Sequence, residues 1–124
     1  MTVKLNQTGY DHATKLIDEG HAVLDERDDW SEHQPSRQEE NRFIEEHGFR
    51  EYRKWHLGID DALGENNKRH YRFPYGDFKN VHRCAVLAAE SRAGQYKYID
   101  IEIAAAHLHG RLEALEKVSR NRKY

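Results

Sequence analysis

Histidine and cysteine side chains form two close pairs in the second half of the sequence. His82 and Cys84 are separated by one residue, and so are His107 and His109. Imidazole nitrogen and thiolate sulfur are ligands of zinc, and two neighbouring helices that carried these pairs could bring them together. One hypothesis is therefore a small metal- or histidine-dependent enzyme, with a divalent metal such as zinc held between the last two helices.

The spacing within each pair argues against this hypothesis. Residues two apart on an α-helix point about 200° away from each other, so both members of a pair do not easily reach one ion. The sequence also has no CxxC and no HExxH motif. The alternative is a set of surface or interhelical histidines that only form hydrogen bonds, and the main expectation is that the protein has no cofactor.

Nucleophilic catalysis finds equally little support in the sequence. Cys84 or Ser91 could act as a nucleophile beside a histidine, but no nucleophile elbow or phosphate-binding glycine loop accompanies either residue. Cys84 lies among apolar residues, which favours a buried small hydrophobic side chain. We therefore expect a protein that is not an enzyme.

A segment rich in cations and aromatic rings is the best candidate for a binding surface. Rings beside cations can stack on bases and contact phosphates, although an ordinary strand with its rings turned inward has the same pattern. We expect an interaction module for a macromolecular partner, either a protein or a nucleic acid. The candidate binding residues are Lys68, Arg69, Tyr71, Arg72, Phe73, Tyr75, Lys79 and Arg83.

Composition limits the class of protein further. The chain has 124 residues with 20 Lys and Arg against 22 Asp and Glu, so it has no overall basic charge that would attract nucleic acid. No apolar run approaches the roughly 20 residues that span a bilayer, and residues 1–20 contain no apolar signal region. With one cysteine and no internal disulfide, we expect a single cytoplasmic domain over 1–124 that does not bind membranes.

Hydrophobic periodicity predicts a mainly α fold with four helices. The expected helices cover about 9–19, 37–47, 78–93 and 101–118, with N-caps at Thr8, Ser36, Asp77 and Asp100. Ser36 and Glu39 form a capping box, and Gly48 is the expected end of the second helix. The acidic stretch 21–34 shows no period and is expected to be an irregular connection.

The remaining pattern predicts a small hairpin and the packing of the last helices. Alternating aromatic residues indicate a hairpin between 52–59 and 71–75, with Pro74 confining its second strand to an edge. Alanines on the last two helices favour a close antiparallel pair. Leu108, Leu112 and Leu115 could pair with a second copy, which leaves a homodimer open, and the basic tail 117–124 is expected to be frayed.

Several short segments resemble a family of small uncharacterised bacterial proteins. They are 55–60 (WHLGID), 71–78 (YRFPYGDF), 81–84 (VHRC), 88–96 (AAESRAGQY), 100–102 (DIE) and 104–110 (AAAHLHG). The resemblance runs from about Ser36 onward and implies a free-standing bacterial domain without an established activity. The hairpin followed by two helices is also similar to a segment of phage head-maturation proteins, which implies a structural or assembly-associated module.

Overall fold

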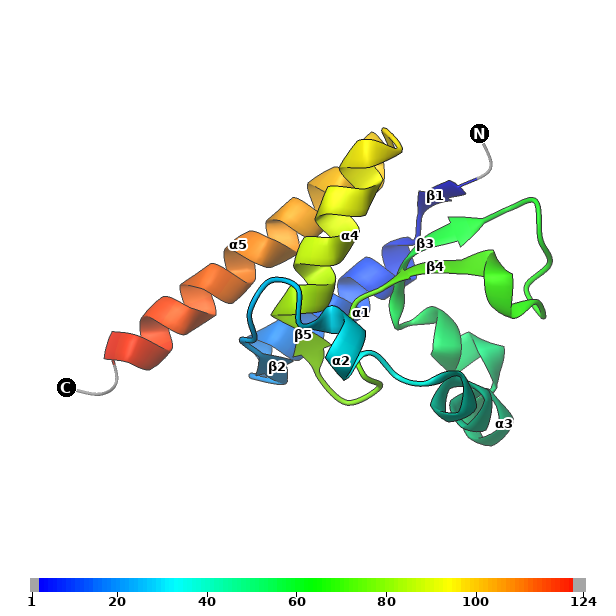
Figure 1. Ribbon diagram of the computed structural model, residues 1–124, viewed down its shortest axis with the longest axis horizontal. Helices are drawn as coiled ribbons and strands as arrows, with labels where there is room; N and C mark the ends of the chain where they lie inside the picture. Colours follow the sequence, from blue (N-terminus) through cyan, green and yellow to red (C-terminus); the bar gives the residue numbers. More distant parts are fainter. Residues whose placement is uncertain (1–2, 122–124) are drawn as a thin grey trace.

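The computed structural model describes residues 3–121 of the chain (Figure 1). It has five α-helices, two small sheets and one short 3-10 helix, η1. The predicted mainly α class is confirmed. The helices are α1 Gln7–Asp18, α2 Trp30–His33, α3 Arg37–Arg53, α4 Arg83–Gln95 and α5 Ile99–Asn121; the strands are β1 Val3–Leu5, β2 Ala22–Val23, β3 His56–Asp60, β4 Tyr71–Pro74 and β5 Val81–His82, and η1 is Lys68–His70.

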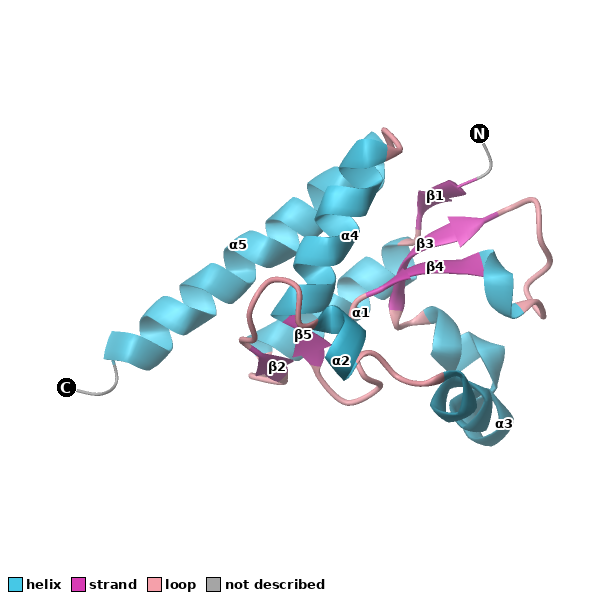
Figure 2. Cartoon of the chain, viewed as in Figure 1, coloured by secondary structure: helices cyan, strands magenta, loops and turns pink. Residues whose placement is uncertain are grey.

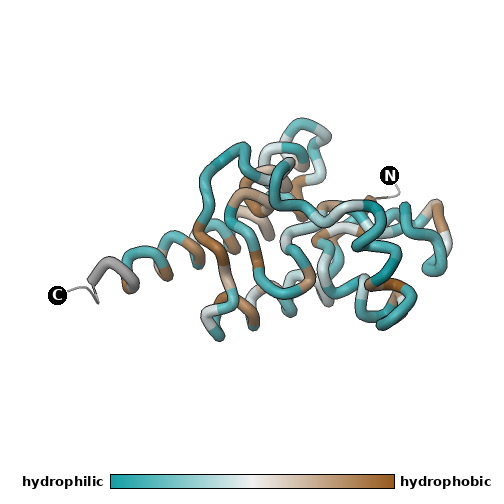
Figure 3. The backbone as a smooth tube through the Cα atoms, turned by 60° about the horizontal axis from the view of Figure 1, so that its bottom comes forward, coloured by the Kyte–Doolittle hydropathy of each residue, from teal (hydrophilic) through white to brown (hydrophobic). Residues whose placement is uncertain are grey.

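Helices α4 and α5 form the predicted antiparallel pair (Figures 1 and 2). Buried alanines, among them Ala89, Ala93 and Ala105, allow the two helix axes to approach closely. Leu108 and Leu112 of α5 are fully buried in the same core, which also contains Leu57 of β3. Beyond this core α5 projects from the body, and hydrophobic residues recur between hydrophilic ones along it (Figure 3).

The predicted hairpin is also confirmed. Strands β3 and β4 are antiparallel, with Gly58 opposite Arg72 and Ile59 opposite Tyr71. Pro74 ends β4, which is an edge strand of the β1-β3-β4 sheet, as a residue without an N–H requires. Strand β1 was not predicted, because three residues are too few to show an alternating pattern.

The start of α1 differs from the prediction, whereas the predicted start and stop signals of α3 hold. Helix α1 begins at Gln7 rather than after Thr8, because buried Asn6 precedes it and donates side-chain hydrogen bonds to the carbonyls of Arg53 and His56. The capping box of α3 is confirmed. Gly48 has a φ of +83° and a ψ of 169°, which are not helical, so the regular helix that begins at Arg37 stops there as predicted. A second helical segment follows this kink, and the two together make up α3 to Arg53.

The second half of the chain differs mainly before α4. Asp77 does not cap a helix; its Oδ1 accepts the N–H groups of Lys79 and Asn80 in a tight turn. Strand β5 follows this turn, so α4 begins at Arg83 instead of 78. Helix α5 includes Asp100, which was predicted as its N-cap, and extends to Asn121, whereas the tail was expected to be frayed from 117. Residues 122–124 of this tail lie outside the described residues.

The stretch 21–34 is more ordered than predicted. It contains β2 and the single turn of α2. Strand β2 pairs in parallel with β5, which draws this stretch against the start of α4 (Figure 1). Within residues 3–121, no helix is both long and apolar enough to cross a membrane.

Candidate metal centre

The parallel pairing of β2 with β5 brings two distant parts of the chain together. Ala22 lies opposite Val81, and Val23 lies opposite His82. Continuing this register by two residues places Asp25 opposite Cys84. Each of the two strands has only two residues, so the contacts that hold them together come mainly from the side chains beyond them.

Four side chains converge where these segments meet. One potential ligand atom from each of Asp25, His33, His82 and Cys84 lies within 4.8 Å of the other three. His33 comes from the end of α2 and Cys84 from the first turn of α4, while His82 ends β5. The cluster therefore joins three elements through one carboxylate, two imidazoles and one thiol.

Asp25 is the centre of this cluster. Its Oδ2 lies 2.7 Å from Nδ1 of both His33 and His82 and accepts a hydrogen bond of 3.1 Å from the Cys84 thiol. Its Oδ1 accepts the Cys84 backbone N–H at 2.8 Å and so satisfies an N–H of the first turn of α4. Burial opposes ionisation of Asp25, but these hydrogen bonds outweigh it and lower its pKa to about 2.

His82 is held between two carboxylates. Its Nδ1 faces Asp25, and its Nε2 lies 2.9 Å from Oδ2 of Asp77. Burial lowers the pKa of His82, but the hydrogen bonds to Asp77 and Asp25 more than offset this and raise it. An imidazole that gives one ring N–H to a carboxylate directs its other nitrogen at a fixed position, as in the outer shell of many zinc sites.

Cys84 is a poor nucleophile in this environment. The residue is buried, and burial together with the adjacent Asp25 carboxylate raises the pKa of its thiol to about 12. The thiol therefore keeps its proton at neutral pH unless a cation lies beside it. A bound metal ion would remove that proton and leave the thiolate as a ligand.

Arg83 fixes the segment that carries Asp25. Its Nε donates to the carbonyl of Asp25 at 2.8 Å, and its Nη2 donates to the carbonyl of Leu24 at 3.0 Å. The other guanidinium nitrogen pairs with Glu116 of α5. Arg83 thus connects the 24–25 segment to α5. The sequence predicted it as part of an exposed binding surface, and the structure does not place it there.

Comparisons with protein-family models, curated proteins and solved structures gave no match. The resemblance to a bacterial family therefore stays a prediction.

The structure divides the predicted metal ligands into two groups. His82 and Cys84 lie together in the cluster, between the 25–33 segment and the start of α4. His107 is exposed on α5, and His109 pairs with Glu90 at 3.2 Å. These two histidines do not take part in the cluster, and no site between α4 and α5 is formed by the four predicted residues.

The predicted binding residues are also divided. Tyr71 and Phe73 are only 7% exposed and Tyr75 is fully buried, so the rings belong to the core and do not form a stacking surface. Arg69, Arg72 and Lys79 are exposed, and Lys68 pairs with Glu40 at 2.8 Å. The structure therefore contains the alternative that the sequence pattern allowed, an ordinary strand whose aromatic rings face the core.

Asp25 and His33 were missed as candidate site residues. Both lie in the acidic stretch for which the sequence predicted only an irregular connection. They lie eight positions apart and match no local motif, and their other partners are distant: His82 is 57 residues from Asp25, and Cys84 is 51 residues from His33. Only the β2–β5 pairing reveals the cluster.

Proposed function

We propose that this protein binds one zinc ion through Asp25, His33, His82 and Cys84. The observation that carries the proposal is the convergence of four different ligand atoms within 4.8 Å of one another. Zinc prefers four ligands in a tetrahedral arrangement and accepts mixtures of carboxylate oxygen, imidazole nitrogen and thiolate sulfur. The donor set of the cluster matches this preference.

The environment of the ligands supports the same ion. Asp25 Oδ2 is the neighbour of three separate donor groups, an arrangement that needs a proton on each of them when no cation is bound. A zinc ion replaces these protons and neutralises the carboxylate and thiolate together. Asp77 behind His82 supplies the outer carboxylate that holds a zinc-bound imidazole in position.

Such an ion would connect parts of the chain that have few other links. It would tie α2 and the 22–25 segment to β5 and α4. The His33 side chain is 37% exposed, whereas Asp25 and His82 are 6% and 8% exposed, so His33 is the ligand nearest solvent. We therefore infer that zinc enters from the α2 side and stabilises the folded chain.

Metal analysis tests this proposal. We expect native mass spectrometry of the purified protein after zinc loading and dialysis to show one zinc per chain. His82→Gln and Cys84→Ser should each lose the ion, because each removes one of the four ligands. With cobalt in place of zinc, the wild type should show the charge-transfer absorption of a thiolate bound to cobalt, and Cys84→Ser should not.

Two histidine variants give matched controls. His107→Gln and His109→Gln remove imidazoles of the same chain that lie outside the cluster, and both should keep one zinc per chain. The proposal would be contradicted if the wild type retained no zinc, or if the His107 and His82 variants lost zinc equally. Circular dichroism of each variant separates loss of the ligand from loss of the fold.

A second candidate function is binding of an acidic partner protein, and a separate cavity favours it. A hollow of about 770 Å³ lies beside η1 and the start of α3 and is bordered by Arg37, Lys68, Arg69 and Arg72, with Glu40 as its acidic residue. Four cations from three elements around one hollow attract an anionic surface. This candidate keeps three of the predicted cations, Lys68, Arg69 and Arg72, and one predicted ring, Tyr71, which also lines the hollow.

Charge reversal tests the second candidate. The double variant Arg69→Glu, Arg72→Glu should elute from a heparin column at a lower salt concentration than the wild type, since two cations no longer contact the polyanion. The double variant Arg42→Glu, Arg50→Glu has the same net charge and exposed positions on α3, and it should elute later than the first. Equal elution of the two variants would contradict a localised site.

A further inference from the structure

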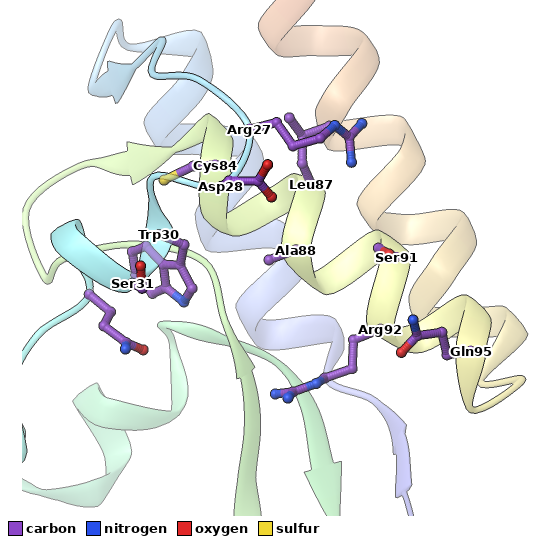
Figure 4. Close-up of a pocket in the computed structure, with 11 residues that line it drawn as sticks. Arg27, Asp28, Trp30, Ser31, Cys84, Leu87, Ala88, Ser91, Arg92 and Gln95 are labelled. Carbon is purple, nitrogen blue, oxygen red and sulfur yellow. The ribbon is translucent and has the colours of Figure 1, made fainter.

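A cavity adjoins the metal cluster at Cys84. It has a volume of about 540 Å³ and lies between the 27–34 segment and one face of α4 (Figure 4). Spacings of three and four residues place the lining residues of α4 on a single helical face. They are Cys84, Leu87, Ala88, Ser91, Arg92 and Gln95, and we call the space along them the α4 groove.

The α4 groove has an aromatic wall, two arginines, Arg92 and Arg27, and one carboxylate, Asp28. Trp30 of α2 forms the wall opposite Ala88, whose small side chain leaves room in front of the ring. The Arg92 side chain extends from α4 toward the side of the groove where Trp30 lies (Figure 4). Among the side chains that the structure describes, none forms an ion pair or hydrogen bond with Arg92, so its guanidinium is free to bind an anion.

The length of the groove relates these features to the metal cluster. Arg92 lies eight positions after Cys84 on the helix, which corresponds to about 12 Å along the axis. A molecule that filled this distance would reach from the guanidinium of Arg92, past the ring of Trp30, to the ligand Cys84. A planar guanidinium binds a carboxylate through two parallel hydrogen bonds, and a flat ring packs well on an indole.

We propose that the α4 groove binds a flat organic carboxylate, with its anionic group on Arg92, its body against Trp30 and its far end beside the metal cluster. Only the role of the far end of this ligand depends on the proposed zinc site. Zinc can expand from four ligands to five, so a ligand whose far end carries a second oxygen donor would lie where it can contact the ion. This assigns the protein a small-molecule ligand in addition to a metal.

Naphthalene-2,6-dicarboxylate is a suitable probe, because it is flat and has a carboxylate at each end. Isothermal titration calorimetry should show saturable binding of one molecule per zinc-loaded chain. Arg92→Gln should weaken binding about tenfold or more, the loss expected for a hydrogen-bonded charge pair. Ala88→Leu should weaken it as well, because a larger exposed side chain on α4 fills the groove without disturbing the core.

Controls separate this inference from the zinc site. Arg42→Gln removes the same charge from an exposed position of α3 and should bind the probe as the wild type does. 2-Naphthoate, which has one carboxylate, should bind with equal affinity with or without zinc and should depend on Arg92 in both states. Absence of saturable binding, or equal affinity of the Arg92 and Arg42 variants, would overturn the groove proposal. A chain that binds 2-naphthoate through Arg92 but retains no zinc would instead overturn the metal site alone.

Discussion

Gly9→Ala is expected to lower the free energy of unfolding by about 3 kcal/mol or more, the largest loss expected for alanine at any of the eight glycines. A Cβ atom at Gly9 would lie 1.8 Å from the carbonyl oxygen of His56 and 2.8 Å from its carbonyl carbon. Both atoms belong to the backbone of β3, so no side-chain rotation relieves the clash. Helix α1 and strand β3 would have to separate.

The surroundings of Gly9 prevent an easy separation. Asn6 is buried just before α1 and donates to the same His56 carbonyl at 2.9 Å. Its backbone N–H also donates to the carbonyl of Leu57, so the start of α1 is fixed to β3 by several bonds. Moving the helix outward breaks these bonds and leaves buried polar groups without partners.

Gly110→Ala is the matched control. Gly110 lies within α5, and a Cβ atom there would have no neighbour within 4 Å. Alanine at this position should raise the free energy of unfolding by about 0.5–1 kcal/mol, because glycine is a poor helix former. Urea denaturation of both variants measures the difference, and a Gly9→Ala protein within 1 kcal/mol of the wild type would contradict the close approach of α1 and β3.

The sequence predicted those parts of the fold whose signals are local. The apolar stripe that includes Leu108 and Leu112 identified α5, and the capping box at Ser36 identified the start of α3. The alternation of Tyr71 with Phe73 identified β4, because every second side chain of a strand faces the core. Each of these signals lies within one element and needs no information about its neighbours.

The metal cluster depends on a contact that no local signal specifies. Asp25 and Cys84 meet through a parallel pair of two-residue strands, which are too short to have a hydrophobic period. The same pairing explains why the sequence argued against a shared site for His82 and Cys84. That argument assumed a helix from 78, but α4 begins at Arg83, so His82 lies in extended backbone and its side chain can face the same point as Cys84.

Asp25→Asn is expected to lower the free energy of unfolding of the metal-free protein by about 3 kcal/mol. The Asp25 carboxylate is 6% exposed and accepts hydrogen bonds from His82 and from both the thiol and the backbone N–H of Cys84. The amide oxygen of asparagine can still accept the backbone N–H of Cys84. Its NH₂ group, however, is a donor and would replace the oxygen that accepts hydrogen bonds from the imidazole and the thiol. The β2–β5 pairing and the first turn of α4 should loosen together.

Asp18→Asn separates this effect from the loss of a surface charge. Asp18 forms an exposed ion pair with Arg111 at 2.8 Å, and such pairs contribute about 1 kcal/mol or less. Urea denaturation in EDTA should therefore place Asp25→Asn well below both Asp18→Asn and the wild type. Zinc at one hundred times its dissociation constant should then stabilise the wild type by about 2.7 kcal/mol and Asp25→Asn by much less, since one of the four ligands is gone. An Asp25→Asn protein as stable as Asp18→Asn in EDTA would show that the carboxylate does not hold the cluster together, and the convergence on which the metal site depends would lose its physical basis.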